Sequence, residues 1–175
     1  MSYFALLYRF RNEERLLIWI SGEPDTVAVN RAGDVVSFQS LAELFRYAQQ
    51  MNWRIEDEKP NLHDLDAINE WILAWQTPPN CQIALEAWNL FSDIAFSTTS
   101  HTKFAFAELD SHAPALYDRL FWGNNLPAVT PQGECFVPAW SEEELKVLGA
   151  LLSAGLEMFG ASVKRWEDSP CNASL

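Results

Sequence analysis

The chain has 175 residues and a formal net charge of −12, from 24 acidic and 12 basic side chains. Hydrophobic residues make up 49% of it and charged residues 21%, a composition typical of a folded globular protein rather than of a disordered chain. Such an acidic chain repels DNA and anionic lipid, and it favours basic proteins, cationic ligands or metal ions. We expect a single globular domain over residues 1–166 and a flexible tail over residues 167–175.

The first third of the chain has the pattern of β-strands. Two short apolar runs, residues 4–10 and 16–20, flank a polar turn, which predicts a hairpin. Residues 26–30 and 35–38 follow after turn-forming residues, so we expect a small antiparallel meander of three or four strands. Residues 53–55 are a candidate for one more short strand.

From residue 40 onward the apolar residues recur with the period of a helix. Ser40 with Glu43, and Ser141 with Glu144, have the capping-box spacing of helix starts. Residues 103–109 are compatible with either a strand or a helix, and residues 123–139 have the composition of a long loop. The fold class that we predict is α+β, with an N-terminal antiparallel β-meander packed against a C-terminal set of four to five helices. The expected helices after residue 60 cover 62–75, 82–97, 113–122 and 141–163.

The negative charge is concentrated in one part of the chain. The first 54 residues hold six acids and six bases, whereas residues 55–100 hold eight acids against the single cation Lys59. A field of this kind predicts a basic partner. The eight acids are Glu56, Asp57, Glu58, Asp64, Asp66, Glu70, Glu86 and Asp93.

The expected helix over residues 62–75 places several polar side chains on one side, with Trp71 on the flank. A short Pro-Pro connection predicts that the next helix packs against it, so that acids on both helices adjoin. We expect Trp71 either to anchor a partner or to pack against the neighbouring helix. Reversing the charges of Asp66 and Glu70 should slow association with little effect on folding. The partner-binding residues predicted on this basis are Glu56, Asp57, Glu58, His63, Asp66, Glu70, Trp71, Glu86 and Asp93.

Catalytic signatures are lacking in the sequence. The adjacent pair His63-Asp64 resembles part of a metal-dependent phosphohydrolase site, but no histidine precedes it to complete such a site. There is no GxSxG motif, no glycine-rich phosphate loop and no CxxC motif among the three cysteines. We therefore expect no enzyme activity, no cofactor and no bound metal. The N-terminus has no secretory signal pattern, and no run of 18 uncharged apolar residues occurs, so we expect a cytoplasmic protein.

A resemblance to a known class of proteins rests on two segments, NLHDLDAINEWI at residues 61–72 and EAWNLFSDIA at residues 86–95. They resemble stretches of small acidic immunity proteins that accompany bacterial polymorphic toxins, including contact-dependent growth inhibition systems. The resemblance implies a cytosolic, non-enzymatic protein that binds and neutralises a cognate toxin domain, and the acidity of the chain predicts that this domain is basic. An acidic protein-binding adaptor or nucleic-acid mimic is the second interpretation, and a metal-dependent phosphohydrolase is the third.

Overall fold

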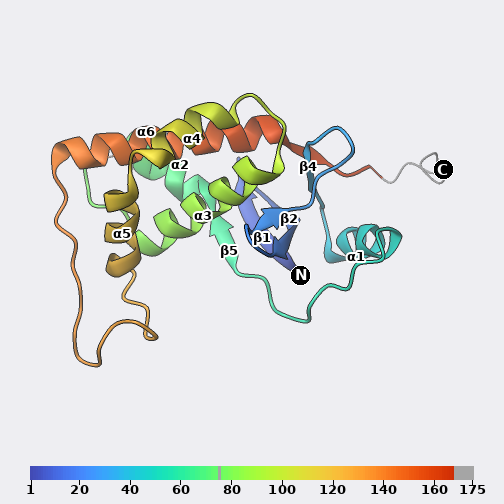
Figure 1. The fold of residues 1–175 in the computed structure, drawn as a ribbon, viewed down its shortest axis with the longest axis horizontal. Coiled ribbons are helices and arrows are strands. Elements are labelled where there is room, and N and C mark those ends of the chain that lie inside the picture. The colour runs from blue at the N-terminus through green and yellow to red at the C-terminus, as the bar shows by residue number, and fades with distance from the viewer. Residues whose placement is uncertain (75, 168–175) are drawn as a thin grey trace.

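The computed structural model describes residues 1–74 and 76–167. Its sheet lies between α1 on one side and the later helices on the other (Figure 1). This confirms the α+β class, and six helices, α1 to α6, follow the strands β1 to β4 among the described residues, one more than the four to five expected, because the ambiguous residues 103–109 are helical. The strands are β1 (Ser2–Phe10), β2 (Glu13–Ser21), β3 (Thr26–Val27), β4 (Val35–Ser37), β5 (Leu62–Asp64) and β6 (Val163–Arg165). The helices are α1 (Leu41–Gln50), α2 (Leu65–Leu73), α3 (Cys81–Ser97), α4 (Lys103–Ser111), α5 (Pro114–Gly123) and α6 (Glu142–Ser162).

The predicted hairpin is confirmed, and it is longer than the apolar runs that indicated it. β1 and β2 pair antiparallel along their whole length. The turn residues Arg11 and Asn12 both have positive φ, 55° and 61°. These are the angles of the two-residue turn whose twist matches that of the two strands of a hairpin. Arg9 and Glu14 face each other beside this turn, with the guanidinium 2.6 Å from the carboxylate, so charged residues extend the strands past their apolar part.

Both faces of the hairpin are buried, each against a different layer. Because side chains alternate along a strand, Leu6 and Leu17 enter the core beneath the large helical layer. Leu16 and Ile18 point the opposite way and pack with Leu44 of α1 in a second, smaller core. The hairpin is therefore the shared wall of two cores.

The sheet is mixed rather than purely antiparallel. Its order is β3-β2-β1-β5, and β5 runs parallel to β1. β4 pairs in parallel with β6, and it is joined to β2 by hydrogen bonds from the Arg15 side chain to Ser37 and by a bridge between Leu16 and the adjacent Phe38. Residues 53–55 form no strand and contribute one bridge, between Tyr3 and Ile55. The meander prediction is thus correct for β1 to β3, and the parallel pairings come from segments distant in sequence.

Most of the predicted helices are present close to their expected bounds, and residues 103–109 belong to a helix, α4. The capping box at Ser141 is formed as predicted. At α1, Ser40 accepts the Glu43 amide, but the Glu43 carboxylate accepts the amide of Gln39 instead of that of Ser40. The helix expected from residue 62 begins three residues later, because β5 is extended and pairs with β1. Asp64 is therefore the N-cap of α2 rather than part of its first turn.

α6 is the longest helix described and runs along the outside edge of Figure 1 from the loop after α5 to β6. It is long and apolar enough to cross a membrane by composition alone, but half of the qualifying stretch is buried inside the fold, where it packs with α2, α3 and α4. The chain then returns to the N-terminal half, where the Trp166 amide donates to the Ser37 carbonyl at 2.8 Å. Of the tail predicted over residues 167–175, all but Glu167 lies outside the described residues.

Two glycines of α6 give a matched test of the contact between α6 and α3. A Cβ on Gly155 would overlap the ring of Phe91, which is fully buried and contacts Phe106 and Phe159. A Cβ on Gly149 would meet no atom within 4 Å. We expect Gly155→Ala to destabilise the protein by roughly 1–3 kcal/mol, because overpacking outweighs the gain in helix propensity.

Gly149→Ala should be neutral or stabilising, by up to about 1 kcal/mol, since only the propensity gain applies. Urea denaturation followed by tryptophan fluorescence measures both variants. Equal effects of the two substitutions would show that α6 does not pack on Phe91 as described.

Candidate functional site

A cavity of about 600 Å³ opens beside the sheet, between β1, α3 and residues 58–61. Its ionisable side chains come from five separate parts of the chain, and its aromatic walls are Phe4, Trp19 and Tyr117. We call it the acidic cavity, since four carboxylates line it against one ammonium group. These charged residues are Asp25, Glu58, Glu86 and Asp93, with Lys59 as the cation.

Asp93 is the most perturbed group of the acidic cavity. It is half-buried on α3, and Trp19 Nε1–H donates to its Oδ2 at 2.9 Å. Burial raises the pKa of Asp93 to about 6; the hydrogen bond from Trp19 opposes this shift, and the nearby Asp25 carboxylate adds to it. At neutral pH the protein therefore holds a charged carboxylate in an unfavourable, partly desolvated place.

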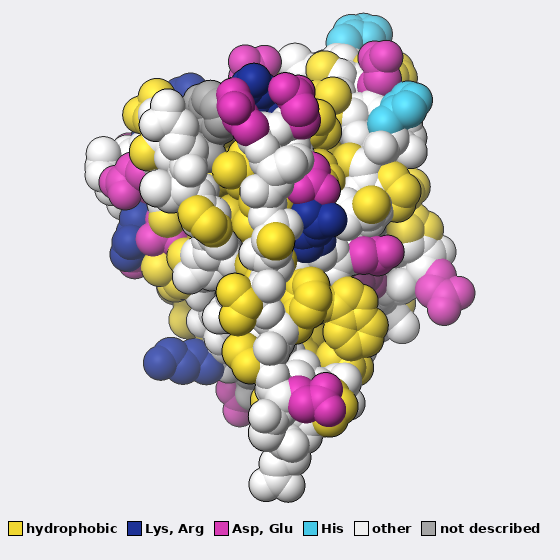
Figure 2. Space-filling model, turned by 90° about the vertical axis from the view of Figure 1, so that its left-hand side faces the viewer, with side chains coloured by type: hydrophobic (Ala, Val, Ile, Leu, Met, Phe, Trp, Pro, Cys, Tyr) yellow, Lys and Arg dark blue, Asp and Glu magenta, His cyan; other side chains and the backbone are white. Residues whose placement is uncertain are grey.

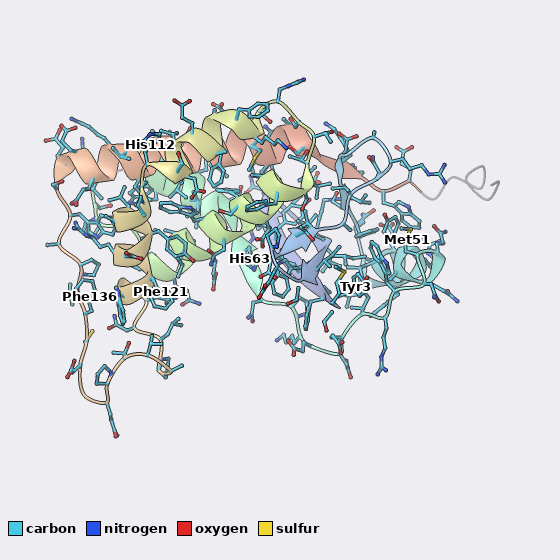
Figure 3. The ribbon with its side chains drawn as sticks, viewed as in Figure 1. Tyr3, Met51, His63, His112, Phe121 and Phe136 are labelled. Atoms are coloured by element: carbon cyan, nitrogen blue, oxygen red, sulfur yellow. The ribbon has the colours of Figure 1, made fainter. Side chains whose placement is uncertain are left out.

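His63 reaches the cavity from β5, where it pairs with Tyr8 of β1. Its Nδ1 is buried and has no hydrogen-bond partner within the described part of the chain. Burial lowers the pKa of His63, while the charge and backbone of Glu86 act in the opposite direction, so the ring is neutral at pH 7. In Figure 3, His63 lies beneath α3, far from His112 at the end of α4.

The aromatic walls of the acidic cavity and their polar contacts involve residues that were not among the partner-binding residues predicted from the sequence. Tyr117 of α5 donates its hydroxyl to Asn89 Oδ1 at 2.9 Å, and Asn89 lies one helical turn before Asp93. The rings of Phe4 and Trp19 are 5.4 Å apart between centroids. The alternation of β2 places Trp19 on the same side as Leu17, which is the only local signal that could have located it.

The structure brings together four of the nine predicted partner-binding residues and separates the others. Glu58, His63, Glu86 and Asp93 line the acidic cavity. Glu56 and Asp57 lie on the segment leading to it, and the Glu56 amide donates to the Tyr3 carbonyl at 2.8 Å.

Asp66 and Glu70 belong to a different hollow, of about 440 Å³, beside the hairpin turn and α6. The two oxygens of Asp66 accept the backbone amides of Arg11 and Asn12, at 2.6 and 2.7 Å. The single polar face that included His63 does not form, because His63 is on a strand and Asp66 is on the helix that follows. Asp66 holds the hairpin turn, so reversing its charge should affect folding, contrary to the expectation from the sequence.

Trp71 packs, half-buried, against the main core, and its Nε1–H donates to the Thr77 carbonyl at 2.9 Å. Of the two interpretations considered for this residue, packing within the fold is the one that these contacts favour. Its ring does not line the acidic cavity.

The long loop between α5 and α6 forms no helix or strand in the described residues. Figure 2 looks at this end of the molecule and shows hydrophobic side chains spread over its lower part. Exposed apolar residues here include Trp122, Leu126, Val129, Phe136 and Val137. Figure 3 labels Phe121 on α5, where it packs against the main core, and Phe136 on the loop.

The carboxylates and His63 of the acidic cavity are not arranged as metal ligands usually are. Among the described residues, no group of three or more His, Cys, Asp or Glu side chains is placed to hold a metal ion. Cys81, at the first position of α3, has its pKa raised by burial rather than lowered by the helix terminus. The arrangement is instead suited to receiving a cationic group between carboxylates and aromatic rings.

The raised pKa of Asp93 has a consequence for stability. The unfolded chain titrates this carboxyl near 3.8 and the folded protein near 6, so the stabilisation from the protonated form is complete below pH 3.8 and is lost as pH rises through 6. We expect Asp93→Asn to be more stable than the parent at pH 8, by roughly 1–2 kcal/mol after allowance for solvent screening.

This advantage should shrink as pH falls from 8 to 4, because the parent carboxyl is then also neutral. Thermal unfolding at several pH values measures it, with Glu108→Gln on the exposed face of α4 as the control. A constant difference across this pH range would contradict the assignment of the shift to Asp93.

Asp66 and Glu70 provide a second matched pair, one turn apart on α2. Asp66→Asn keeps only one acceptor oxygen for two amide donors, so we expect a loss of about 1–2 kcal/mol in the free energy of unfolding. Glu70→Gln changes an exposed carboxylate and should alter it by less than about 0.5 kcal/mol. Chemical denaturation separates the two, and similar values for both would remove the structural role of Asp66.

No protein-family model, curated protein or solved structure matches this chain.

Proposed function

We propose that this chain is a non-enzymatic, cytoplasmic immunity protein that binds a cognate basic toxin domain and neutralises it. The observation that carries the proposal is the acidic cavity, where four carboxylates from three separate segments face one cation between aromatic walls. The resemblance of residues 61–72 and 86–95 to immunity proteins supplies the biological role. Both segments contribute to this one cavity, through His63 and through Glu86 and Asp93, which supports a shared purpose for them.

A basic side chain of the partner would relieve the unfavourable charge of Asp93. Folding brings Asp25 close enough to Asp93 for its negative charge to disfavour the charged form of Asp93. Perturbed carboxyls of this kind occur preferentially at functional sites, because a site built for a ligand is not optimised for stability without it. A guanidinium or ammonium group would pair with these carboxylates, and a guanidinium would also stack on Trp19.

The charge has a kinetic role as well. A negative cavity raises the rate at which a basic protein is captured, and rapid capture is what protection from a toxin inside the cell requires. The same field would serve a basic partner that is not a toxin, so the adaptor interpretation is separated from this one only by the identity of the partner.

The direct experiment expresses the C-terminal domain encoded immediately upstream of this gene, with and without this protein, and scores cell survival. Survival only in the presence of this protein is the expected result. Continued killing in its presence would reject the immunity role for that partner.

A matched pair of charge reversals tests the surface. Glu86 lines the acidic cavity, whereas Glu70 lies in the hollow beside the hairpin turn. We expect Glu86→Lys to slow association with the toxin domain roughly 5- to 10-fold at low salt, and Glu70→Lys to change it less than about 2-fold. The difference should shrink near 0.5 M salt, where the Debye length is about 4 Å.

Association rates come from biolayer interferometry with a catalytically inactive toxin domain, and melting temperatures of both variants verify their folding. If Glu70→Lys slowed association and Glu86→Lys did not, the binding surface would be the one beside the hairpin turn.

A further inference from the structure

A further hollow, of about 170 Å³, lies between α3 and α4 and is mostly apolar. Phe106, which is fully buried, contributes to it from α4. Phe96 and Phe104 also line it, although 67% and 61% of their surfaces are exposed. Two large aromatic side chains beside a hollow expose an unusual amount of apolar surface to solvent. Such surface commonly marks an interaction site.

This apolar hollow adjoins the acidic cavity at one residue of α3. Ser92 of α3 lines both of them. Ser92 and Phe96 are four positions apart on α3, and Asn89, Asp93 and Phe96 follow one another at intervals of four and three positions, so these residues share one face of the helix. Seven residues of helix span about 10 Å, which is the separation along the axis between the Asn89 end and the Phe96 end. One partner surface can therefore cover both sites.

We infer that the basic partner that occupies the acidic cavity also inserts an apolar side chain into the hollow between α3 and α4; this inference rests on the proposed function. The partner surface then carries a basic residue and, roughly 10 Å away, an aliphatic or aromatic one. The two sites affect different rate constants of binding. Exposed charge acts mainly on the rate of encounter, and a desolvated apolar anchor acts mainly on the rate of dissociation.

The other exposed apolar residues are less well placed for this partner. Leu41, Phe45 and Met51 belong to α1 and its C-cap, and none of them lines the acidic cavity. Residues of the loop after α5 line a separate hollow with Glu134 and Cys135. Only the hollow between α3 and α4 shares a lining residue with the acidic cavity among the hollows described here.

The test measures dissociation of the inactive toxin domain by biolayer interferometry. The double variant Phe96→Ala/Phe104→Ala should raise the dissociation rate at least 10-fold and change association less than about 2-fold. Ala107→Trp, which fills the hollow from its exposed rim, should raise the dissociation rate as well. Phe45→Ala on α1, where 51% of the side chain is exposed, is the control and should leave both rates unchanged.

Unchanged dissociation in the double variant and in Ala107→Trp, with association still slowed by Glu86→Lys, would overturn this inference and leave the proposed function standing. If the parent protein bound the toxin domain but neither set of substitutions altered any rate, both surfaces would be rejected. If the parent did not bind the toxin domain at all, the proposed function would fail and this inference with it.

Discussion

The arrangement of this protein depends on a hairpin whose two faces are both buried. Strands with apolar residues on alternate faces need cover on each side, so β1 and β2 require α1 below them and the layer α2 to α6 above them. The turn between the strands is tied to α2 by the carboxylate of Asp66, which fixes the hairpin against the larger layer. The acidic cavity opens where that layer leaves the N-terminal part of β1 uncovered.

The position of the cavity explains its chemistry. Its walls are the end of a buried sheet and the side of a buried helix, so carboxylates placed there are partly removed from water without being fully enclosed. Asp93 shows this most clearly, since its environment is apolar enough to raise its pKa and open enough for a partner to reach it. A carboxylate on a fully solvated helix face would carry the same charge but would not select a partner that fits a partly buried site.

The elements predicted well from sequence are those with local signals. The hairpin, the Ser141 capping box and α3 each depend on residues within a few positions of one another. The pairings of β5 with β1 and of β4 with β6 depend on distant segments, and three-residue strands carry no periodicity to detect. Misplacing the start of α2 by three residues also misassigned the site, because it put His63 on one face with Asp66. Trp19 and Tyr117 join the site only through the fold.

The parallel pairing of β4 with β6 also concerns how the protein is made. Ser37 contacts Lys164, which lies 127 positions later in the sequence, and the chain between these two residues contributes to both cores. During synthesis from the N-terminus, one edge of β4 stays open until β6, about 127 residues later, has been produced. Contacts of this range slow folding, since a long loop has to close before they contribute. The growing chain therefore carries an unpaired strand edge throughout the synthesis of the residues between β4 and β6, and β6 then covers that edge.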